Sequence, residues 1–265
     1  MKGYDLVSGG LNVWIFEYRE LIHILTVSNL RVKYQSSVLG FAWSLLNPLL
    51  LMLVLYFVYS HLFVTQTKNF AIFLLVGIIT FRVWANGTSS ALSSIFEQSS
   101  LVTKIYIPRQ IIVFSVVLSG LISSLLEFVV LFAFTLVFGI IPTTSIVLFP
   151  VILVIYFLIV YGMSLPLAAL FVYYRDLNQI WTVIVQLAFF ICPVMYSLAI
   201  IPAQYLPYYT LNPVTIVMTS FRDIFLYGTF PDLLSLLILC GLTIGILIIG
   251  TLIFSRLERR FAEEL

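Results

Sequence analysis

The chain has 265 residues, of which 62% are hydrophobic and only 9% are charged. A soluble domain usually carries about a quarter of its residues as charge. The 13 basic and 11 acidic side chains present cannot supply the polar shell that such a domain needs. The composition therefore predicts an integral membrane protein. The net charge of +2 and the scattered basic residues exclude a disordered protein and a nucleic-acid binder.

Six apolar runs are each long enough to cross a bilayer as a helix, which takes about 20 residues. They cover residues 38–63, 70–93, 111–138, 146–173, 180–200 and 233–254. The runs are too long for transmembrane strands and lack the period-two alternation of such strands. We therefore predict an all-α membrane protein with a single domain over residues 1–265. Its parts are a cytoplasmic segment 1–37, a six-span bundle 38–254 and a cytoplasmic tail 255–265.

The basic residues outside these runs gather on one side of the predicted bundle. Ten of them lie there, namely Lys2, Arg19, Arg31, Lys33, Lys104, Arg109, Arg175, Arg256, Arg259 and Arg260. Only Lys68 and Arg222 fall on the opposite side. Because cytoplasmic loops are enriched in Lys and Arg, this pattern predicts a multi-pass protein of the cytoplasmic (inner) membrane with both termini in the cytoplasm. We expect no cleavable signal peptide, since about 35 mixed residues precede the first apolar run.

The first residues of the chain have a pattern of their own. Apolar side chains recur at helical spacing, at Leu11, Trp14, Ile15, Tyr18, Leu21, Ile22 and Leu25. Glu17, Glu20 and His23 lie off that stripe. The pattern predicts an amphipathic helix along the cytoplasmic membrane surface, which either contacts a partner or serves as a simple anchor.

Residues 197–228, between the fifth and sixth runs, form the most irregular segment. It contains Pro202, Pro207 and Pro213 and a cluster of three tyrosines, yet it remains largely apolar. Prolines interrupt a spanning helix, and lipid tolerates no exposed unpaired backbone. We therefore predict two short re-entrant helices on the external side that pack on protein. An ordinary external loop, the alternative, would usually be more polar.

Signatures of catalysis and of metal binding are scarce. The only histidines are His23 and His61, and no group of Cys, His and carboxylates has metal-ligand spacing. Cys192 and Cys240 lie in apolar runs, which favours buried apolar residues over a disulfide. No Gly-Lys dipeptide occurs, so a phosphate-binding P-loop is not encoded. These residues favour a transport or scaffolding protein over an enzyme, with a catalytic Ser/His/Asp arrangement left open by the sequence.

Two charges fall inside the predicted spans, where each is costly unless it is paired or hydrated. Arg82 lies about 12 residues from the external start of the second span, and Glu127 about 11 residues from the external end of the third. At 1.5 Å per residue both sit roughly 17 Å deep. Because consecutive spans are usually neighbours, we predict an Arg82–Glu127 ion pair. A proton relay is the alternative, although relays usually need more titratable groups.

Polar and aromatic side chains share one face of two predicted spans. In the fifth span they are Gln179, Thr182, Gln186, Phe189, Pro193 and Tyr196. At the first span they are Ser36, Gly40, Trp43 and Asn47, followed by Tyr56 and Tyr59. Hydroxyl and amide groups mixed with flat rings suit a sugar ligand. Helix packing explains such faces equally well, so the periodicity leaves both readings open.

Several segments follow one another in a distinctive order. They are residues 31–48 (RVKYQSSVLGFAWSLLNP), with a Leu-Gly turn, 100–109 (SLVTKIYIPR), 174–176 (YRD), 192–196 (CPVMY), 211–213 (LNP), 221–222 (FR) and 256–262 (RLERRFA). In this order, with the predicted spans between them, they resemble the ABC-2 type permease subunits that export polysaccharides, including O-antigen, capsule and teichoic acid. The resemblance covers nearly the entire chain.

This resemblance implies a homodimer of six-span subunits that works with two copies of a cytoplasmic P-loop ATPase, which binds ATP and Mg. A lipid-linked polysaccharide would cross a channel at the dimer interface, lined by Tyr34, Ser36, Gly40, Trp43, Asn47, Tyr56, Tyr59, Gln179, Thr182, Gln186, Phe189, Pro193 and Tyr196. The external gate would comprise Tyr205, Tyr208, Tyr209, Asn212 and Pro213. Contact with the ATPase would involve Trp14, Tyr18, Glu97, Ser100, Lys104, Tyr106 and Arg109.

On this reading the chain itself holds no cofactor and no metal, and its partners are the ATPase, a second copy, the polysaccharide and membrane lipids. Three other functions remain open from the residues alone. They are an ABC-2 exporter of drugs or lipids, a proton-coupled secondary transporter that uses Arg82 and Glu127, and a membrane-embedded transferase acting on lipid-linked sugars. The transferase is disfavoured because no acidic cluster faces a membrane surface.

Overall fold

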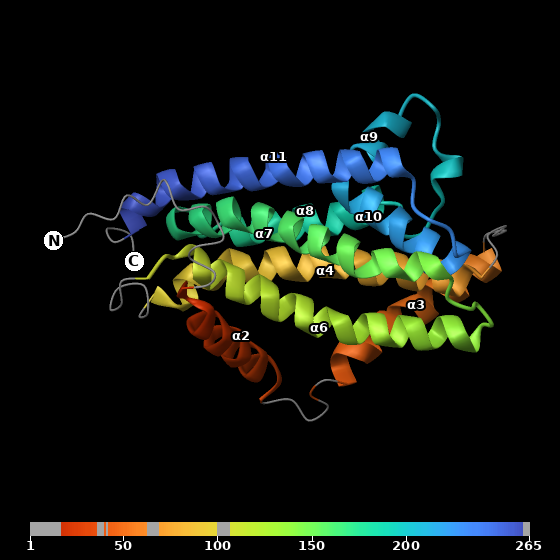
Figure 1. Ribbon diagram of the computed structural model, residues 1–265, viewed down its shortest axis with the longest axis horizontal. Coiled ribbons are helices and arrows are strands. Elements are labelled where there is room, and N and C mark those ends of the chain that lie inside the picture. The colour runs from red at the N-terminus through yellow and green to blue at the C-terminus, as the bar shows by residue number, and fades with distance from the viewer. Residues whose placement is uncertain (1–16, 36–39, 41, 63–68, 100–106, 262–265) are drawn as a thin grey trace.

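The computed structural model describes residues 17–35, 40, 42–62, 69–99 and 107–261. Throughout these ranges the regular elements are helices, and no strand is formed. The long helices lie alongside one another, and α2 lies obliquely next to α6 at the end of the bundle where α11 ends (Figure 1). The all-α class expected from the sequence is therefore confirmed.

The α-helices of the described ranges are α2 (Arg19–Tyr34), α3 (Ala42–Leu62), α4 (Phe70–Glu97), α6 (Gln110–Val137), α7 (Phe149–Tyr173), α8 (Leu177–Ile191), α9 (Leu206–Thr210), α10 (Pro213–Arg222) and α11 (Leu233–Leu257). Five helical segments of these ranges are long and apolar enough to cross a membrane, namely Ala42–Ser60, Phe70–Glu97, Gln110–Val137, Thr144–Tyr173 and Leu233–Leu257. They correspond to five of the six predicted runs.

The fifth predicted run, residues 180–200, does not form one long helix. Helix α8 ends at Ile191 after 15 residues. This length is about 22 Å, against about 30 Å for the hydrocarbon core of a bilayer. Cys192 then takes an extended conformation, with ψ of 143°, because the ring of the following Pro193 disfavours a helical conformation in the residue before it. The expected helix to residue 200 is wrong, and α8 alone is shorter than a span.

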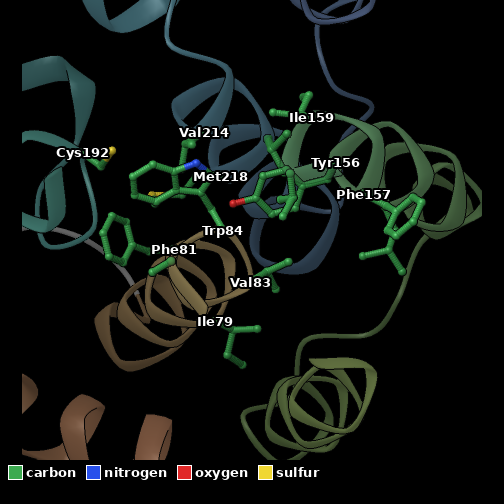
Figure 2. Close-up of a cluster of buried hydrophobic side chains, with 14 of the residues drawn as sticks. Ile79, Phe81, Val83, Trp84, Tyr156, Phe157, Ile159, Cys192, Val214 and Met218 are labelled. Atoms are coloured by element: carbon green, nitrogen blue, oxygen red, sulfur yellow. The ribbon is translucent and has the colours of Figure 1, made fainter. Parts of the chain in front are cut away.

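Helix α4 is the centre of the bundle. Of its 28 residues 21 are buried, and it contacts α3, α6, α7, α8 and α10. Figure 2 shows Phe81 and Trp84 of α4 in one apolar cluster with Tyr156 of α7 and Met218 of α10. The hydroxyl of the fully buried Tyr156 donates a hydrogen bond to the carbonyl of Thr80 at 2.8 Å. Apolar packing and this buried bond fix α7 against α4.

Glycine permits the closest helix contacts. Helices α7 and α11 cross at Gly162 and Gly250, where a Cβ on Gly250 would overlap the carbonyl oxygen of Gly162. Helices α4 and α6 meet at Gly87 and Gly120, where a Cβ on Gly120 would lie 3.9 Å from the Cα of Gly87. Small residues at such crossings let backbones approach closely, which is the main source of packing energy between helices in lipid.

The N-terminal stripe predicted from the sequence is described only in part. Leu11, Trp14 and Ile15 lie outside the described residues. Helix α2 packs against α6, with Ile22 buried between them and Glu20 exposed. The helix therefore has an apolar face turned toward the bundle, as its periodicity predicts; its position at a membrane surface stays a prediction.

The segment 197–228 contains α9, α10 and a π-helical turn at Asp223–Tyr227. Asn212 caps α10, since its side-chain oxygen accepts a hydrogen bond from the backbone N–H of Val214 at 3.0 Å, and Pro213 occupies the first helical position. Eight of the ten residues of α10 are buried, whereas α9 has no buried residue. The segment is thus one well-packed helix preceded by an exposed one.

Candidate functional site

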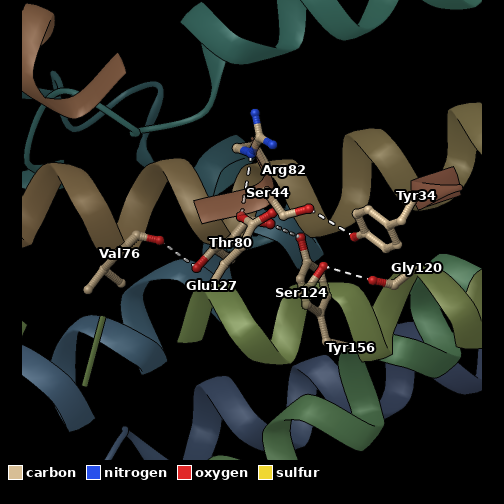
Figure 3. A network of polar contacts seen from close by, with 9 residues as sticks. All are labelled: Tyr34, Ser44, Val76, Thr80, Arg82, Gly120, Ser124, Glu127 and Tyr156. Carbon is tan, nitrogen blue, oxygen red and sulfur yellow. Dashed lines mark hydrogen bonds and ion pairs between the residues drawn. The ribbon is translucent and has the colours of Figure 1, made fainter. Parts of the chain in front are cut away.

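The intramembrane ion pair predicted from the sequence is present. The Nε of Arg82 on α4 lies 3.4 Å from Oε2 of Glu127 on α6, and the Arg82 side chain is 22% exposed against 5% for Glu127 (Figure 3). This distance is long for a charge-assisted hydrogen bond, so the contact is chiefly electrostatic. The prediction assumed that Arg82 and Glu127 lie at equal depth in neighbouring helices, and α4 and α6 are indeed in contact.

The first part of the face predicted for the fifth span lies on the outside of this single chain, where Gln179, Thr182 and Gln186 are exposed. The rest of that face does not, since Phe189 and Tyr196 are half-buried and Pro193 is buried. Trp181, which lies off this face, is buried. The indole N–H of Trp181 donates a hydrogen bond to the hydroxyl of Thr88 on α4 at 3.2 Å. Helix α8 is therefore held to α4 by its apolar side, which leaves the polar side available to a ligand or a second chain.

The aromatic face of α3 also points away from the core. Trp43 and Tyr56 are 50% and 44% exposed, and Asn47 is exposed. Tyr59 is half-buried, and its ring centroid lies 6.0 Å from that of Phe70. The chain enters α3 through Gly40, whose φ of 46° is in the left-handed region that glycine adopts without strain. Ser36 lies outside the described residues.

Tyr34, at the end of α2, joins this region. Its hydroxyl lies 2.9 Å from that of Ser44 on α3, within hydrogen-bond distance. Figure 3 places both residues beside the Arg82–Glu127 pair. Of the residues predicted at the first span, Tyr34 is thus linked to the start of α3. Tyr56 and Tyr59 lie toward the other end of α3, with ring centroids 6.5 and 6.0 Å from that of Phe70.

An open cavity of about 400 Å³ lies beyond the end of α8. It is lined by Tyr196, Ile200, Ile201, Pro202, Tyr205, Tyr208 and Tyr209. The Tyr196 hydroxyl donates to the carbonyl of Ile191 at 2.6 Å and lies 3.2 Å from the hydroxyl of Tyr209. Several tyrosine rings around one hollow suit stacking on sugar rings. The structure therefore brings Tyr196 of the predicted channel together with three tyrosines of the predicted gate.

Arg222 is a key residue that the sequence reasoning missed. It is 3% exposed, and its Nη2 donates hydrogen bonds to the carbonyls of Pro193 at 2.8 Å and Val194 at 2.9 Å. Its guanidinium carbon lies 3.5 Å from the ring centroid of Phe73. Arg222 therefore ties the irregular segment after α8 to both α4 and α10. The available signal was a lone arginine in a largely apolar segment, which was assigned to an external surface.

Asp223, beside Arg222, is half-buried in the π-helical turn. Burial raises the pKa of its carboxyl to about 6, although the neighbouring Arg222 opposes the shift. Asp232, at the start of α11, is exposed, and hydrogen bonds from Ser235 lower the pKa of that carboxyl. The external segment therefore contains one carboxyl that changes charge under mildly acidic conditions.

The opposite end of the bundle is held by arginine contacts. Nη1 of Arg109 donates to the carbonyl of Glu258 at 2.6 Å, and its guanidinium lies 5.5 Å from the ring centroid of Phe261. Burial raises the pKa of the Glu258 carboxyl, while Arg109 partly offsets this shift. Arg175 lies 3.5 Å from the ring centroid of Phe96 at the end of α4.

The other predicted ATPase-contact residues are less well defined. Tyr18 is half-buried and Glu97 is exposed. Trp14, Ser100, Lys104 and Tyr106 lie outside the described residues. Next to Arg175, at the same end, is a cavity of about 530 Å³ lined by Leu170, Tyr173, Tyr174, Arg175, Asp176, Leu177 and Ile180. No group of three His, Cys, Asp or Glu side chains able to hold a metal occurs in the described part of the chain.

The described residues form a bundle of long apolar helices around a buried central helix. The bundle contains the Arg82–Glu127 ion pair and turns polar side chains outward. These features define a polytopic helical membrane protein. The chain belongs to the ABC-2 type transporter family, whose profile matches residues 20–226.

Curated relatives match nearly the full length of the chain. It is 30% identical over 248 residues to an O-antigen export system permease protein RfbA of Klebsiella pneumoniae, which covers 93% of this chain and 95% of the relative. It is 31% identical over 253 residues to the protein of the same name from Myxococcus xanthus, with 95% and 97% covered. A second Klebsiella pneumoniae protein of that name is 29% identical over 248 residues.

Proposed function

We propose that this chain is the permease subunit of an ATP-driven exporter that moves a lipid-linked polysaccharide, such as O-antigen, across the cytoplasmic membrane. The observation that carries the proposal is the similarity to O-antigen export permeases over at least 93% of the chain. The outward polar faces of α3 and α8 and the tyrosine-lined cavity are consistent with it, because sugars take hydrogen bonds from amides and hydroxyls and stack on rings.

The working unit in this proposal is a homodimer with two copies of a separate ATPase. The exposed faces of α3 and α8 would line a channel between the two copies, since polar side chains in a membrane face a partner or water and not lipid. Helix α8 and the segment after it, to residue 200, would together complete a sixth span. Both termini would then lie in the cytoplasm, as the distribution of basic residues favours.

Energy must come from another chain, because this sequence encodes no P-loop. We place the ATPase at the end of the bundle where Arg109 meets Glu258, next to residues 100–106. ATP and Mg would bind to that partner, and closure of the ATPase pair would move the subunits as rigid bodies.

The test is reconstitution of the purified chain into vesicles, with and without the P-loop ATPase encoded in the same gene cluster. We expect the chain alone to hydrolyse no ATP, and the complex to hydrolyse ATP and to move O-antigen only when ATP is supplied. An ionophore that removes the proton gradient should leave transport unchanged. Transport that stops with the ionophore while ATP remains, or ATP hydrolysis by the chain alone, would refute the proposal.

A further inference from the structure

Helix α4 carries a polar face that the sequence reasoning did not single out. Only seven of its 28 residues are not buried. Six of the seven are polar or charged, and we call them the α4 polar stripe: Arg82, Asn86, Ser89, Ser90, Ser93 and Glu97. Steps of three and four residues place them on one side of the helix. The most buried spanning helix is therefore open along a single polar line.

Apart from Arg82, the residues of the stripe are not used to hold the described fold together. Among the described residues, the side chains of Asn86, Ser89, Ser90 and Ser93 make no hydrogen bond with another side chain or with the backbone. The threonines of α4 behave differently, since the hydroxyl of Thr88 donates to the carbonyl of Trp84 at 2.8 Å. Donors and acceptors of the stripe thus remain available to something outside the described chain.

The neighbours of α4 define where the stripe opens. On one side α8 packs against α4 through Trp84 and Trp181, with ring centroids 5.6 Å apart, and through Phe81 and Phe189, 5.3 Å apart. On the other side α6 approaches α4 at Gly87. At about 100° per residue, Phe81 and Trp84 each lie more than about 100° around α4 from the middle of the stripe, so the stripe is on a different side of α4 from the α8 contact.

Arg82 gives the stripe its charge. Its Nε faces Glu127, whereas Figure 3 shows the terminal amino groups pointing away from that carboxylate. In the described part of the chain these amino groups have no partner, and the side chain is 22% exposed. A guanidinium edge is thus left free at the opening.

A free guanidinium edge is suited to an oxyanion, because its parallel N–H groups match the oxygens of a phosphate or a carboxylate. The rest of the stripe down to Ser93 is neutral and offers only amide and hydroxyl groups, which suit neutral sugar hydroxyls. One cation above a row of neutral donors fits a cargo with a single anionic group and a long neutral portion.

We propose that the α4 polar stripe is a cargo-binding wall of the translocation path and that Arg82 binds an oxyanion of the cargo, with Glu127 positioning it. The proposal rests on the proposed function and adds to it a third surface and a charged site. The oxyanion is a phosphate on a lipid carrier or a carboxylate on a sugar, which share the same recognition chemistry.

Accessibility tests the wall without reference to cargo. Single cysteines are placed at Asn86, Ser89 and Ser93 in full-length chain whose Cys192 and Cys240 are replaced by Ala. The chain is reconstituted in nanodiscs and treated with a charged, membrane-impermeant thiol reagent. Matched controls are Ile79→Cys, fully buried on the same helix, and Val129→Cys, 64% exposed on α6. We expect the stripe to react at least about tenfold faster than both controls, because a charged reagent does not enter hydrocarbon.

If the stripe cysteines react as slowly as the controls, the stripe is covered by lipid or by the second copy. That result would overturn the proposal that the stripe lines the translocation path. If the stripe cysteines react quickly but the complex with the ATPase does not transport polysaccharide, only the proposed function is contradicted. The two failures are therefore distinguishable.

The oxyanion site is tested by ligand binding. Quenching of tryptophan fluorescence is measured with a long-chain alkyl diphosphate and its alcohol, and with a galacturonic acid tetramer and a neutral hexose tetramer. The variant R82Q/E127Q removes both charges together, so that no unpaired carboxylate is left buried. The variant R82K keeps the positive charge but lacks the parallel N–H groups of the guanidinium. We expect at least one anionic probe to bind about tenfold more weakly to R82Q/E127Q, with neutral probes unchanged.

The pattern of loss identifies the source of the oxyanion. Loss for the alkyl diphosphate alone assigns a phosphate on a lipid, and loss for the uronic acid tetramer alone assigns a sugar carboxylate. Equal binding of every probe to wild type and to R82Q/E127Q, with both proteins folded, would overturn the site.

Discussion

Replacing Arg222 by Met should destabilise the protein more than any exposed arginine replacement. The change leaves the carbonyls of Pro193 and Val194 without their donor, at about 1–3 kcal/mol each for a buried group. It also removes a stacked cation 3.5 Å from the ring centroid of Phe73, worth about 2 kcal/mol when desolvated. The buried Nε of Arg222 has no partner among the described residues, so its removal returns about 1–2 kcal/mol. The net loss should be about 2–7 kcal/mol.

The assay is unfolding of the chain in mixed micelles by increasing sodium dodecyl sulfate, with the unfolding free energy extrapolated linearly. Arg175→Met is the matched control, because Arg175 also lies 3.5 Å from a ring centroid, that of Phe96, but is exposed. It should cost about 1 kcal/mol or less. If Arg222→Met costs no more than Arg175→Met, the argument from buried carbonyls is refuted.

Three further predictions concern packing, the ion pair and acidity. Gly250→Ala should lower the unfolding free energy by about 1–3 kcal/mol through overpacking, whereas Gly241→Ala, with nothing within 4 Å of the added Cβ, should be neutral in the same titration. Arg82→Glu should reduce the yield of folded protein in detergent, and adding Glu127→Arg should restore it; absence of rescue would contradict a stabilising pair. The pKa of the Asp223 carboxyl is raised to about 6 in the folded state, against 3.8 for a free carboxyl of this type. The folded state therefore holds the proton more tightly than the unfolded state does. Stability contributed by Asp223 is therefore present below about pH 4 and lost as the pH rises through 6. Limited proteolysis of the external segment should be slower at pH 5 than at pH 7, and Asp223→Asn should remove this difference.

The spans, the ion pair and the apolar face of α2 were predictable because they follow from the length and spacing of apolar and charged residues along the chain. The positions of five spans follow from apolar runs of sufficient length. The Arg82–Glu127 pair was predictable because the helical rise places two buried charges at equal depth on consecutive helices. The amphipathic character of α2 was likewise visible in its period. Each of these features is decided by hydrophobicity or by distance along a helix, and both can be read directly from the sequence.

The features that were missed depend on contacts between distant segments. The apolar run continues past Pro193, so hydrophobicity alone extends α8 although the backbone leaves the helix at Cys192. The partners of Arg222 are carbonyls 28 and 29 residues away, and backbone carbonyls carry no signature in a sequence. The α4 polar stripe was not singled out from the sequence, because only the positions of the neighbouring helices show which face of α4 stays open.

The ties at the two ends of the bundle constrain how work from an ATPase would be used. Nη1 of Arg109 donates to the carbonyl of Glu258, and the hydroxyl of Tyr173 donates to the carbonyl of Leu257 at 2.7 Å. The start of α6, the end of α7 and the end of α11 are therefore joined directly at this end of the bundle. At the other end Arg222 joins α4 and α10 to the segment after α8. A push at the Arg109–Glu258 contact would accordingly move α6, α7 and α11 together. Because packed cores are bistable and not continuously deformable, the displacement is best accommodated between two copies, where the proposed function places both the exposed faces of α3 and α8 and the cargo.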